Sequence, residues 1–272
     1  MIEIIMNVLE KKMCDILKRC CEYHGAIGTK AEFEAEGTRT DELLRLLEIA
    51  NKSDAKIALK IGGCEAIKDL YESKQFGVNY IIAPMVETPY ALEKFINARK
   101  IVYNESEAED TNFLFNCETV TTFNNLSSII NVCENNKNSI NGIVFGRVDF
   151  VGSLGLSRSD IESHKVTNSV LKVSNKCKEI GIDFVVGGAV SYDARENLRK
   201  FKESYLSRFE TRKVIFDSKA LELKDLEQGL KDAVHFELLW LLNKRDYYSG
   251  IYKEDAKRIE MLESRWKILN EN

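Results

Sequence analysis

Short apolar segments alternate with amphipathic segments along most of the chain. In the amphipathic segments apolar residues recur every three or four positions, which is the spacing of a helix with one buried face. The expected helices are residues 7–23, 41–51, 65–74, 89–98, 126–134, 161–180 and 193–203. The apolar segments between them have the length of strands, and the expected strands are residues 30–37, 56–63, 78–87, 112–119, 143–149, 182–189 and 212–217. Strands that alternate with helices predict βα units and a parallel sheet, and therefore an α/β fold.

The number of strands favours a TIM-type (β/α)8 barrel. Seven strands are expected from the pattern, and a barrel of this type needs an eighth. Residues 1–6 are the spare segment that is compatible with a strand, so we expect an irregular first strand there. A doubly wound open sheet is the alternative, but neither a GxGxxG motif nor a P-loop follows the first strand.

The chain from residue 220 onward has a different pattern, with leucines at helical spacing and no further strand. A first stripe consists of Leu221, Leu223, Leu226, Leu230, Val234, Leu238 and Leu241, and residues 256–269 form a second. We therefore predict a barrel with an N-terminal helix over residues 1–219 and a helical extension over 220–272, which packs on the barrel or on a neighbouring subunit. An apolar stripe of this length is costly in water, so we expect a homo-oligomer.

Composition and charge exclude several classes of partner. The 272 residues include 44% hydrophobic and 30% charged residues, and the formal net charge is −4. An acidic chain without clustered basic residues is not expected to bind nucleic acid. No apolar run approaches the roughly 20 residues that span a bilayer, so no membrane partner is expected. The seven cysteines are scattered without a CxxC pair, which favours a reducing cytoplasm.

Two of the expected strands end at a carboxylate. Glu118 lies at the end of the strand over residues 112–119, and Asp149 ends the next one. The carboxyl ends of parallel barrel strands converge on one face, where two carboxylates can hold a divalent cation. The alternative is that both are ordinary acids at the start of loops.

Three stretches around these residues resemble a known family. They are Ile82-Ala83-Pro84-Met85-Val86-Glu87-Thr88, then Asn116-Cys117-Glu118-Thr119, then Phe145-Gly146-Arg147-Val148-Asp149 with Ser153-Leu154-Gly155. In this order they resemble strand ends of the 2-keto-3-deoxy-acid aldolase and citrate lyase β-subunit family (HpcH/HpaI-like). The similarity extends over roughly residues 28–190.

The resemblance implies a barrel of the phosphoenolpyruvate/pyruvate type that holds Mg²⁺ or Mn²⁺. In that family a Glu at the fifth strand end and an Asp at the sixth bind the metal, and these positions match Glu118 and Asp149. The implied activity is that of a class II, metal-dependent aldolase or lyase, in which the ion polarises the keto group of a 2-keto acid such as a pyruvate or oxaloacetate unit.

The sequence departs from the family at two positions. Lys60 stands at a third strand end where the family has an arginine that binds the substrate carboxylate, and a lysine lacks its bidentate fork. Gly37 stands where the aldolases have a histidine of the acid–base apparatus. We therefore expect Lys60, Arg39 and Glu36 to act in catalysis, with Arg39 replacing positive charge and Glu34 or Glu36 near metal-bound water.

Other residues near these strand ends are weaker candidates. Arg147 is expected either to contact an anionic substrate or to brace its loop. Glu87 either lines the site or is an acid at a helix N-terminus. Gly152 and Ser153 belong to a loop that is expected to approach the substrate. The charged residues 210–213 are expected at the opposite end of the barrel, exposed to solvent.

The predicted function is a metal-dependent carbon–carbon lyase that acts on a 2-keto acid. Two alternatives stay open: an altered barrel that binds a carboxylate ligand without turnover, and a phosphoenolpyruvate-using enzyme on the same fold.

Overall fold

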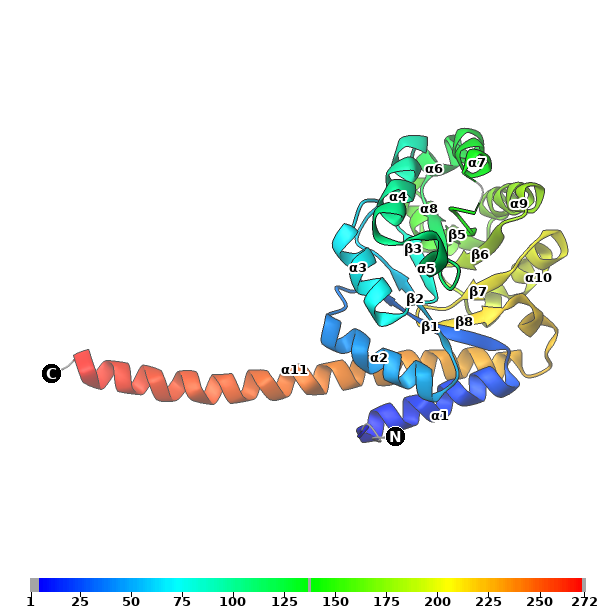
Figure 1. Ribbon diagram of the computed structural model, residues 1–272. Coiled ribbons are helices and arrows are strands. Elements are labelled where there is room, and N and C mark those ends of the chain that lie inside the picture. Colours follow the sequence, from blue (N-terminus) through cyan, green and yellow to red (C-terminus); the bar gives the residue numbers. More distant parts are fainter. Residues whose placement is uncertain (1–4, 137, 271–272) are drawn as a thin grey trace.

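The computed structural model describes residues 5–136 and 138–270, and its centre is a closed barrel of eight strands (Figure 1). Each strand pairs with the strands before and after it in the chain, and β8 closes the barrel on β1. The strands are β1 Ala26–Glu32, β2 Lys56–Lys60, β3 Tyr80–Ala83, β4 Asn112–Cys117, β5 Gly142–Gly146, β6 Asp183–Gly187, β7 Arg208–Glu210 and β8 Val214–Asp217. The predicted TIM-like α/β barrel is confirmed.

Helices cover the outside of the barrel. They are α1 Val8–Tyr23, α2 Thr40–Lys52, α3 Ile67–Phe76, α4 Pro89–Val102, α5 Glu105–Ala108, α6 Val120–Asn124, α7 Leu126–Asn135, α8 Arg147–Ser153, α9 His164–Ile180, α10 Arg195–Ser204 and α11 Leu226–Asn270. Three 3-10 turns join them, η1 Arg158–Glu162, η2 Tyr192–Ala194 and η3 Ser218–Glu222. Local sequence fixes several starts: Asn7 caps α1 through the N–H of Glu10, and Thr88 caps α4, whose first residue is Pro89.

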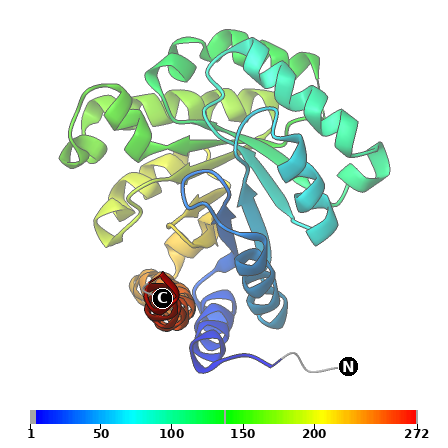
Figure 2. The same cartoon turned by 90° about the vertical axis from the view of Figure 1, so that its left-hand side faces the viewer.

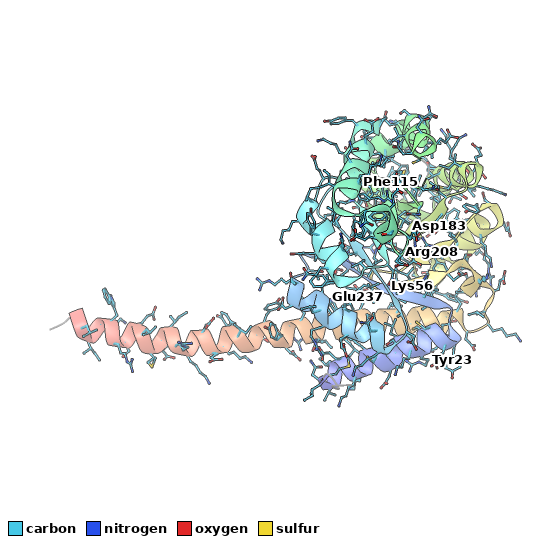
Figure 3. The ribbon with its side chains drawn as sticks, in the orientation of Figure 1. Tyr23, Lys56, Phe115, Asp183, Arg208 and Glu237 are labelled. Carbon is cyan, nitrogen blue, oxygen red and sulfur yellow. The ribbon has the colours of Figure 1, made fainter. Side chains whose placement is uncertain are left out.

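Alternate side chains of the strands separate two cores. Residues that point outward, such as Phe113 and Phe115 of β4, pack beneath the helices. Residues that point inward fill the barrel itself; they are Ala58, Tyr80, Ile82, Leu114, Val144, Val185 and Ile215. At the amino ends of the strands Arg208 pairs with Asp183 at 2.6 Å and lies over the ring of Tyr80 (Figure 3). The interior is therefore packed, and a ligand site has to lie at the other end of the barrel.

The eighth strand is not where we expected it. Residues 1–4 lie outside the described residues, and Ile5 and Met6 precede α1 without forming a strand. The additional strand is the short β7, so Lys60 ends β2, Glu118 follows β4 and Asp149 follows β5. The resemblance to the family placed Lys60 at the third strand end, Glu118 at the fifth and Asp149 at the sixth. Each of these strand numbers is therefore one too high. The first strand also lies earlier than expected, which places Glu34 and Glu36 in the loop after it.

The barrel is mixed, whereas we expected every strand to be parallel. β1 to β7 are parallel, but β8 is antiparallel to both of its neighbours. Only residues 211–213 separate β7 from β8, and so short a connection makes a hairpin and excludes a crossover. The hairpin loop therefore lies at the same end of the barrel as the carboxyl ends of the other strands.

Helix α11 packs beside α1 along the side of the barrel and then continues well beyond it (Figures 1 and 2). Leu226, Leu230, Phe236 and Trp240 of its first part are buried, but four residues of the predicted apolar stripe are exposed in this chain, Leu223 just before the helix and three within it. Val234, Leu238 and Leu241 are 63%, 53% and 53% exposed. Within the described part of the chain, no helix is both long and apolar enough to cross a membrane. The boundary at residues 219 and 220 stays a prediction.

Candidate active site

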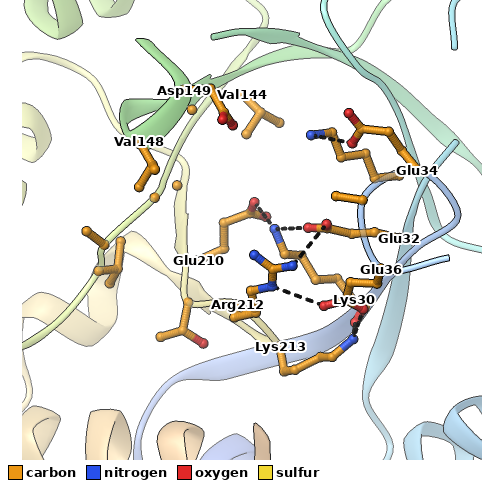
Figure 4. Close-up of a pocket in the computed structure, with 18 of the residues that line it drawn as sticks. Lys30, Glu32, Glu34, Glu36, Val144, Val148, Asp149, Glu210, Arg212 and Lys213 are labelled. Carbon is orange, nitrogen blue, oxygen red and sulfur yellow. Dashed lines mark hydrogen bonds and ion pairs between the residues drawn. The ribbon is translucent and has the colours of Figure 1, made fainter. Parts of the chain in front are cut away.

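A cavity of about 750 Å³ opens at the carboxyl ends of the parallel strands. It is lined by the ends of β1, β2, β4, β5 and β6, by the β7–β8 hairpin and by one face of α11. Figure 4 shows Asp149 on one side of the cavity and a group of acidic and basic side chains on the other. Strand ends that are far apart in the sequence therefore share one space.

Glu118 is the most constrained carboxylate of the cavity. It is 1% exposed, and its Oε2 accepts hydrogen bonds from Asn116 Nδ2 at 2.6 Å and Lys60 Nζ at 3.3 Å. Its Oε1 accepts the N–H of Met85 at 2.9 Å. Gly146 leaves room for it, because a Cβ at Gly146 would lie 2.8 Å from the Cβ of Glu118. The strand ends of β3, β4 and β5 thus hold this side chain in one orientation.

Burial raises the pKa of the Glu118 carboxyl, and the nearby Asp149 carboxylate adds to the increase. Lys60 opposes it. Burial by itself would lower the pKa of Lys60, but Glu118 and Glu34 outweigh that effect and raise the pKa above its ordinary value. Lys60 Nζ lies 2.9 Å from Glu34 Oε2, so a protonated lysine joins two carboxylates at the cavity wall. The sequence prediction that Lys60 and Glu118 belong to one site agrees with this contact.

Asp149 lies in the first turn of α8, and its side chain is exposed to the cavity. No ion pair or hydrogen bond of its carboxylate is found among the described residues. Asn116 also lines the cavity, and its buried Oδ1 has no hydrogen-bond partner in the described part of the chain. A Glu carboxylate, an Asp carboxylate and an amide oxygen are the hard oxygen donors that Mg²⁺ and Mn²⁺ prefer. The residues present therefore fit the divalent cation that the sequence predicts.

The protein would supply only part of the coordination of such an ion. Among the described residues, no group of three or more His, Cys, Asp and Glu side chains is placed to hold a metal. Glu118 and Asp149 would be the charged ligands, with the Asn116 amide beside them. The remaining positions would be left to water and to a bidentate ligand, as in catalytic sites that keep open positions.

Six charged side chains form the opposite side of the cavity, and we call them the charged wall: Lys30, Glu32, Glu36, Glu210, Arg212 and Lys213 (Figure 4). Lys30 Nζ lies 2.6 Å from Glu210 and 3.4 Å from Glu32. Arg212 Nε lies 3.1 Å from Glu36, which also pairs with Lys213. Three cations therefore face three carboxylates, and the wall neutralises itself.

The charged wall corrects the prediction for residues 210–213. We expected them in solvent at the opposite end of the barrel, but Glu210 is 5% and Lys213 is 1% exposed. The cause is the β7–β8 hairpin, which turns at the mouth of the barrel. Burial lowers the pKa of Lys213 even though Glu36 opposes the effect.

Glu36 and Arg39 take different places although only two residues separate them. Glu36 lines the cavity as a member of the charged wall. Arg39 does not line it; its guanidinium lies 5.2 Å from the ring of Tyr248 on α11, and its backbone precedes α2. Gly37 between them has a φ of +56°, a conformation that suits glycine and places the chain in a tight turn.

Arg147 is fully buried and does not line the cavity. Its guanidinium donates to the carbonyl oxygens of Gly188 at 2.8 and 3.1 Å and of Ala189 at 3.3 Å, and it pairs with Glu162 at 2.8 Å. Of the two roles expected for Arg147, these contacts agree with bracing a loop, because they connect the loop after β6 to α8.

The remaining candidates for substrate binding also have structural partners outside the cavity lining. Glu87 accepts a hydrogen bond from Thr119 Oγ1 at 2.7 Å. Ser153 Oγ accepts the N–H of Val120 at 2.8 Å and donates to the carbonyl of Phe150. Gly152 lies beside Ser153 near the end of α8. Glu87 and Ser153 thus connect the strand-end loops to one another.

Arg158 is a cavity residue that the sequence did not single out. It begins η1, and its exposed side chain lines the cavity together with Asp149. The other lysines and arginines of the lining have carboxylate partners, whereas no ion pair of Arg158 is found among the described residues. No motif surrounds it, so no signal in the sequence distinguished it from an ordinary loop arginine.

The sequence matches the model of one family, described as HpcH/HpaI aldolase/citrate lyase, over residues 41–205. This is more than half of the chain, and it contains Lys60, Glu118 and Asp149. The chain therefore belongs to the HpcH/HpaI aldolase/citrate lyase family. A search of curated protein sequences finds no match.

Solved structures share the fold at low sequence identity. An HpcH/HpaI aldolase from Desulfitobacterium hafniense DCB-2 is 14% identical with a TM-score of 0.58, over 81% of this chain and 88% of that one. An HpcH/HpaI aldolase/citrate lyase family protein from Burkholderia cenocepacia J2315 is 12% identical with a TM-score of 0.60, over 82% and 90%. The citrate synthase SbnG is 16% identical with a TM-score of 0.58, over 74% and 81%.

Proposed function

We propose that this protein is a metal-dependent carbon–carbon lyase that acts on a 2-keto acid with a pyruvate or oxaloacetate unit. The observation that carries the proposal is the position of Glu118 and Asp149 in one cavity, beside an amide oxygen that has no partner within residues 5–136 and 138–270. Membership of an aldolase/citrate lyase family supports it. One relative of the same fold is described as a citrate synthase, so the proposal covers both cleavage and formation of the bond.

Glu118, Asp149 and the Asn116 amide would hold Mg²⁺ or Mn²⁺. The ion, when bound, would supply polarisation of the keto group. Lys60 keeps Glu118 oriented and partly compensates its charge in the dry wall of the cavity. Because Lys60 is already paired with two carboxylates, its charge is less available to the carboxylate of a substrate.

Arg158 is the residue that we propose for the substrate carboxylate. It lies on the Asp149 side of the cavity, and a guanidinium can bind a carboxylate through two parallel hydrogen bonds. In this role it would replace the arginine that the family carries at the position of Lys60. Glu34 and Glu36, on the loop after β1, stay candidates for proton transfer through water.

The metal site is tested by binding and by turnover together. Mn²⁺ titration by calorimetry is expected to show one site per chain, and Glu118→Gln or Asp149→Asn is expected to weaken binding by about tenfold or more. The same variants should lose activity in a screen of 2-keto acids with aldehydes in the presence of Mn²⁺. Glu87→Gln is the matched control, because Glu87 follows a neighbouring strand but contacts Thr119 and does not line the cavity.

One alternative has an observation in its favour. Lys60 occupies a hydrogen-bonding position on Glu118 that a metal ion would also use, which suits an altered barrel that binds a carboxylate ligand without turnover. Calorimetry separates the two: keto-acid binding without any Mn²⁺ binding and without turnover in the screen would favour the altered barrel. We also propose that the protein forms a homo-oligomer and that it is located in the cytoplasm. The exposed part of α11 supports the homo-oligomer, and the seven free cysteines support the reducing compartment.

A further inference from the structure

One exposed stripe runs along α11 from the barrel to the end of the helix. It alternates steps of four and three residues, which is the seam of a coiled coil. Its members, which we call the α11 seam, are Val234, Leu238, Leu241, Arg245, Tyr248, Tyr252, Asp255, Ile259, Leu262, Trp266 and Leu269. At 1.5 Å per residue the seam is about 50 Å long.

Most of the seam is open to solvent. Val234, Leu238 and Leu241 are more than half exposed although they lie beside the barrel, and Tyr248 is half-buried against Glu42 of α2. Every described side chain from residue 250 to residue 269 is exposed, and Figure 3 shows this part of α11 standing clear of the barrel. Apolar surface that recurs along one stripe of a helix indicates a binding surface for another helix.

Two charged residues interrupt the seam and determine how a partner could fit it. In a parallel pair of identical helices each seam residue meets its own copy, so Arg245 would face Arg245 and Asp255 would face Asp255. In an antiparallel pair centred near residue 250, Arg245 of one chain faces Asp255 of the other, and the reverse contact forms by symmetry. Charge complementarity therefore favours the antiparallel arrangement.

The same register places eight of the nine apolar seam residues opposite one another, and Leu269 falls opposite residue 231, beyond the seam. The pairs are Val234 with Trp266, Leu238 with Leu262, Leu241 with Ile259 and Tyr248 with Tyr252. At the flanks Glu237 faces Arg265 and His235 faces Glu263, while Lys244 faces Arg258 unfavourably. One register thus pairs both charged positions and eight of the nine apolar positions of the seam.

From this pattern we infer that two copies of the chain pair through antiparallel α11 helices, with Arg245 of each copy against Asp255 of the other. The part of α11 that leaves one barrel then lies across the part that packs on the other barrel. Val234 and Leu241 line the cavity, so residues near position 260 of the second copy complete its rim. A lipid surface is disfavoured, because residues 250–270 carry five basic and four acidic side chains.

Charge exchange at the two polar positions tests the pairing. Arg245→Asp places Asp against Asp, and Asp255→Arg places Arg against Arg, so each variant alone should weaken self-association by about tenfold or more. An equimolar mixture of the two variants restores both opposite-charge contacts and should form a heterodimer as strong as the wild type. Sedimentation velocity and light scattering across a concentration series measure the masses.

Lys257→Glu is the matched control, since residue 257 lies on the helix face opposite the seam and should leave the mass unchanged. The neighbour of Arg245 in an ion pair is Asp246 of the same helix, so these substitutions do not disturb the barrel, and circular dichroism verifies the helix content. A monomeric wild type, single variants with wild-type mass, or a mixture that does not recover would each overturn the antiparallel pairing. The last two results would indicate a parallel coil or a different interface.

Discussion

At the scale of single residues, the cavity is notable for how completely its cations are paired. Lys30, Lys60, Arg212 and Lys213 each lie within 3.1 Å of a carboxylate oxygen. Moving any of them onto a substrate would leave a buried or half-buried carboxylate without its partner, which is costly. Arg158 can bind an anion without that loss.

Arg158→Gln is therefore expected to raise KM for the 2-keto acid by about tenfold or more and to change kcat less, because it removes binding that is present before the transition state is reached. Steady-state kinetics with a series of keto-acid concentrations measure both constants. Arg195→Gln is the control, since Arg195 stacks on Tyr192 and does not line the cavity. A loss of kcat at unchanged KM would contradict the role in substrate binding.

Single residues also show how far the sequence determines the site. Glu118 and Asp149 could be predicted to lie together, because both follow strands and parallel strand ends converge. Arg39 could not be placed, since its orientation depends on contact with Tyr248 more than 200 residues later in the chain. Arg147 and Glu87 stand beside cavity residues in the sequence, but their side chains are directed to carbonyl and hydroxyl groups that only the folded barrel brings near.

At the scale of elements, one buried carboxylate joins α1 to α2. Glu10 is 3% exposed and accepts hydrogen bonds from Arg45 Nε at 2.7 Å and Nη2 at 2.6 Å, and from the N–H of Asn7. Burial by itself would raise the pKa of Glu10, but Arg45 and Asn7 outweigh it and hold the pKa below its usual value. The folded state therefore stabilises the ionised carboxylate.

Glu10→Gln is expected to lower the free energy of unfolding at pH 7 by about 1–3 kcal/mol, because a charged hydrogen-bonded pair is lost from a buried position. A carboxyl whose pKa is lowered by folding contributes stability above its unfolded pKa and loses it as the pH falls through the folded value. The difference between wild type and variant should therefore shrink below about pH 4. Urea unfolding at several pH values measures it, and the exposed Glu22→Gln on the same helix should show no difference.

The lengths of the strands explain why β7 and β8 are harder to predict from the sequence than β2 to β6. From β2 to β6 each strand is followed by a helix, so the alternation in the sequence matches the alternation in the fold. β7 has three residues, too few to show a period of two, and it was missed. The hairpin that follows then reverses β8, and this reversal brings the charged wall to the mouth of the barrel. Two short runs around a three-residue polar loop were the available signal for a hairpin.

At the scale of the whole molecule, α11 has two parts with different neighbours. The part beside α1 contributes Leu226, Leu230, Phe236 and Trp240 to the core of the barrel, so its removal would expose that core. The part beyond residue 250 makes no buried contact with the barrel among the described residues. A helix that stands alone in water is only marginally stable, and the proposed pairing with a second copy would provide the packing that this part lacks.

The two parts are separable in a measurement of stability. Pairing through α11 should raise the free energy of unfolding of the dimer by about 1.4 kcal/mol for each tenfold increase in protein concentration above the dissociation constant, and the thermal midpoint of the full chain should rise with it. A chain that ends after Ser249 should keep the barrel and unfold at a midpoint that does not change with concentration. Differential scanning calorimetry over a hundredfold range of concentration compares the two. Equal concentration dependence in both chains would mean that association uses a surface of the barrel, whereas a truncated chain that fails to fold would show that the distal part of α11 supports the barrel itself.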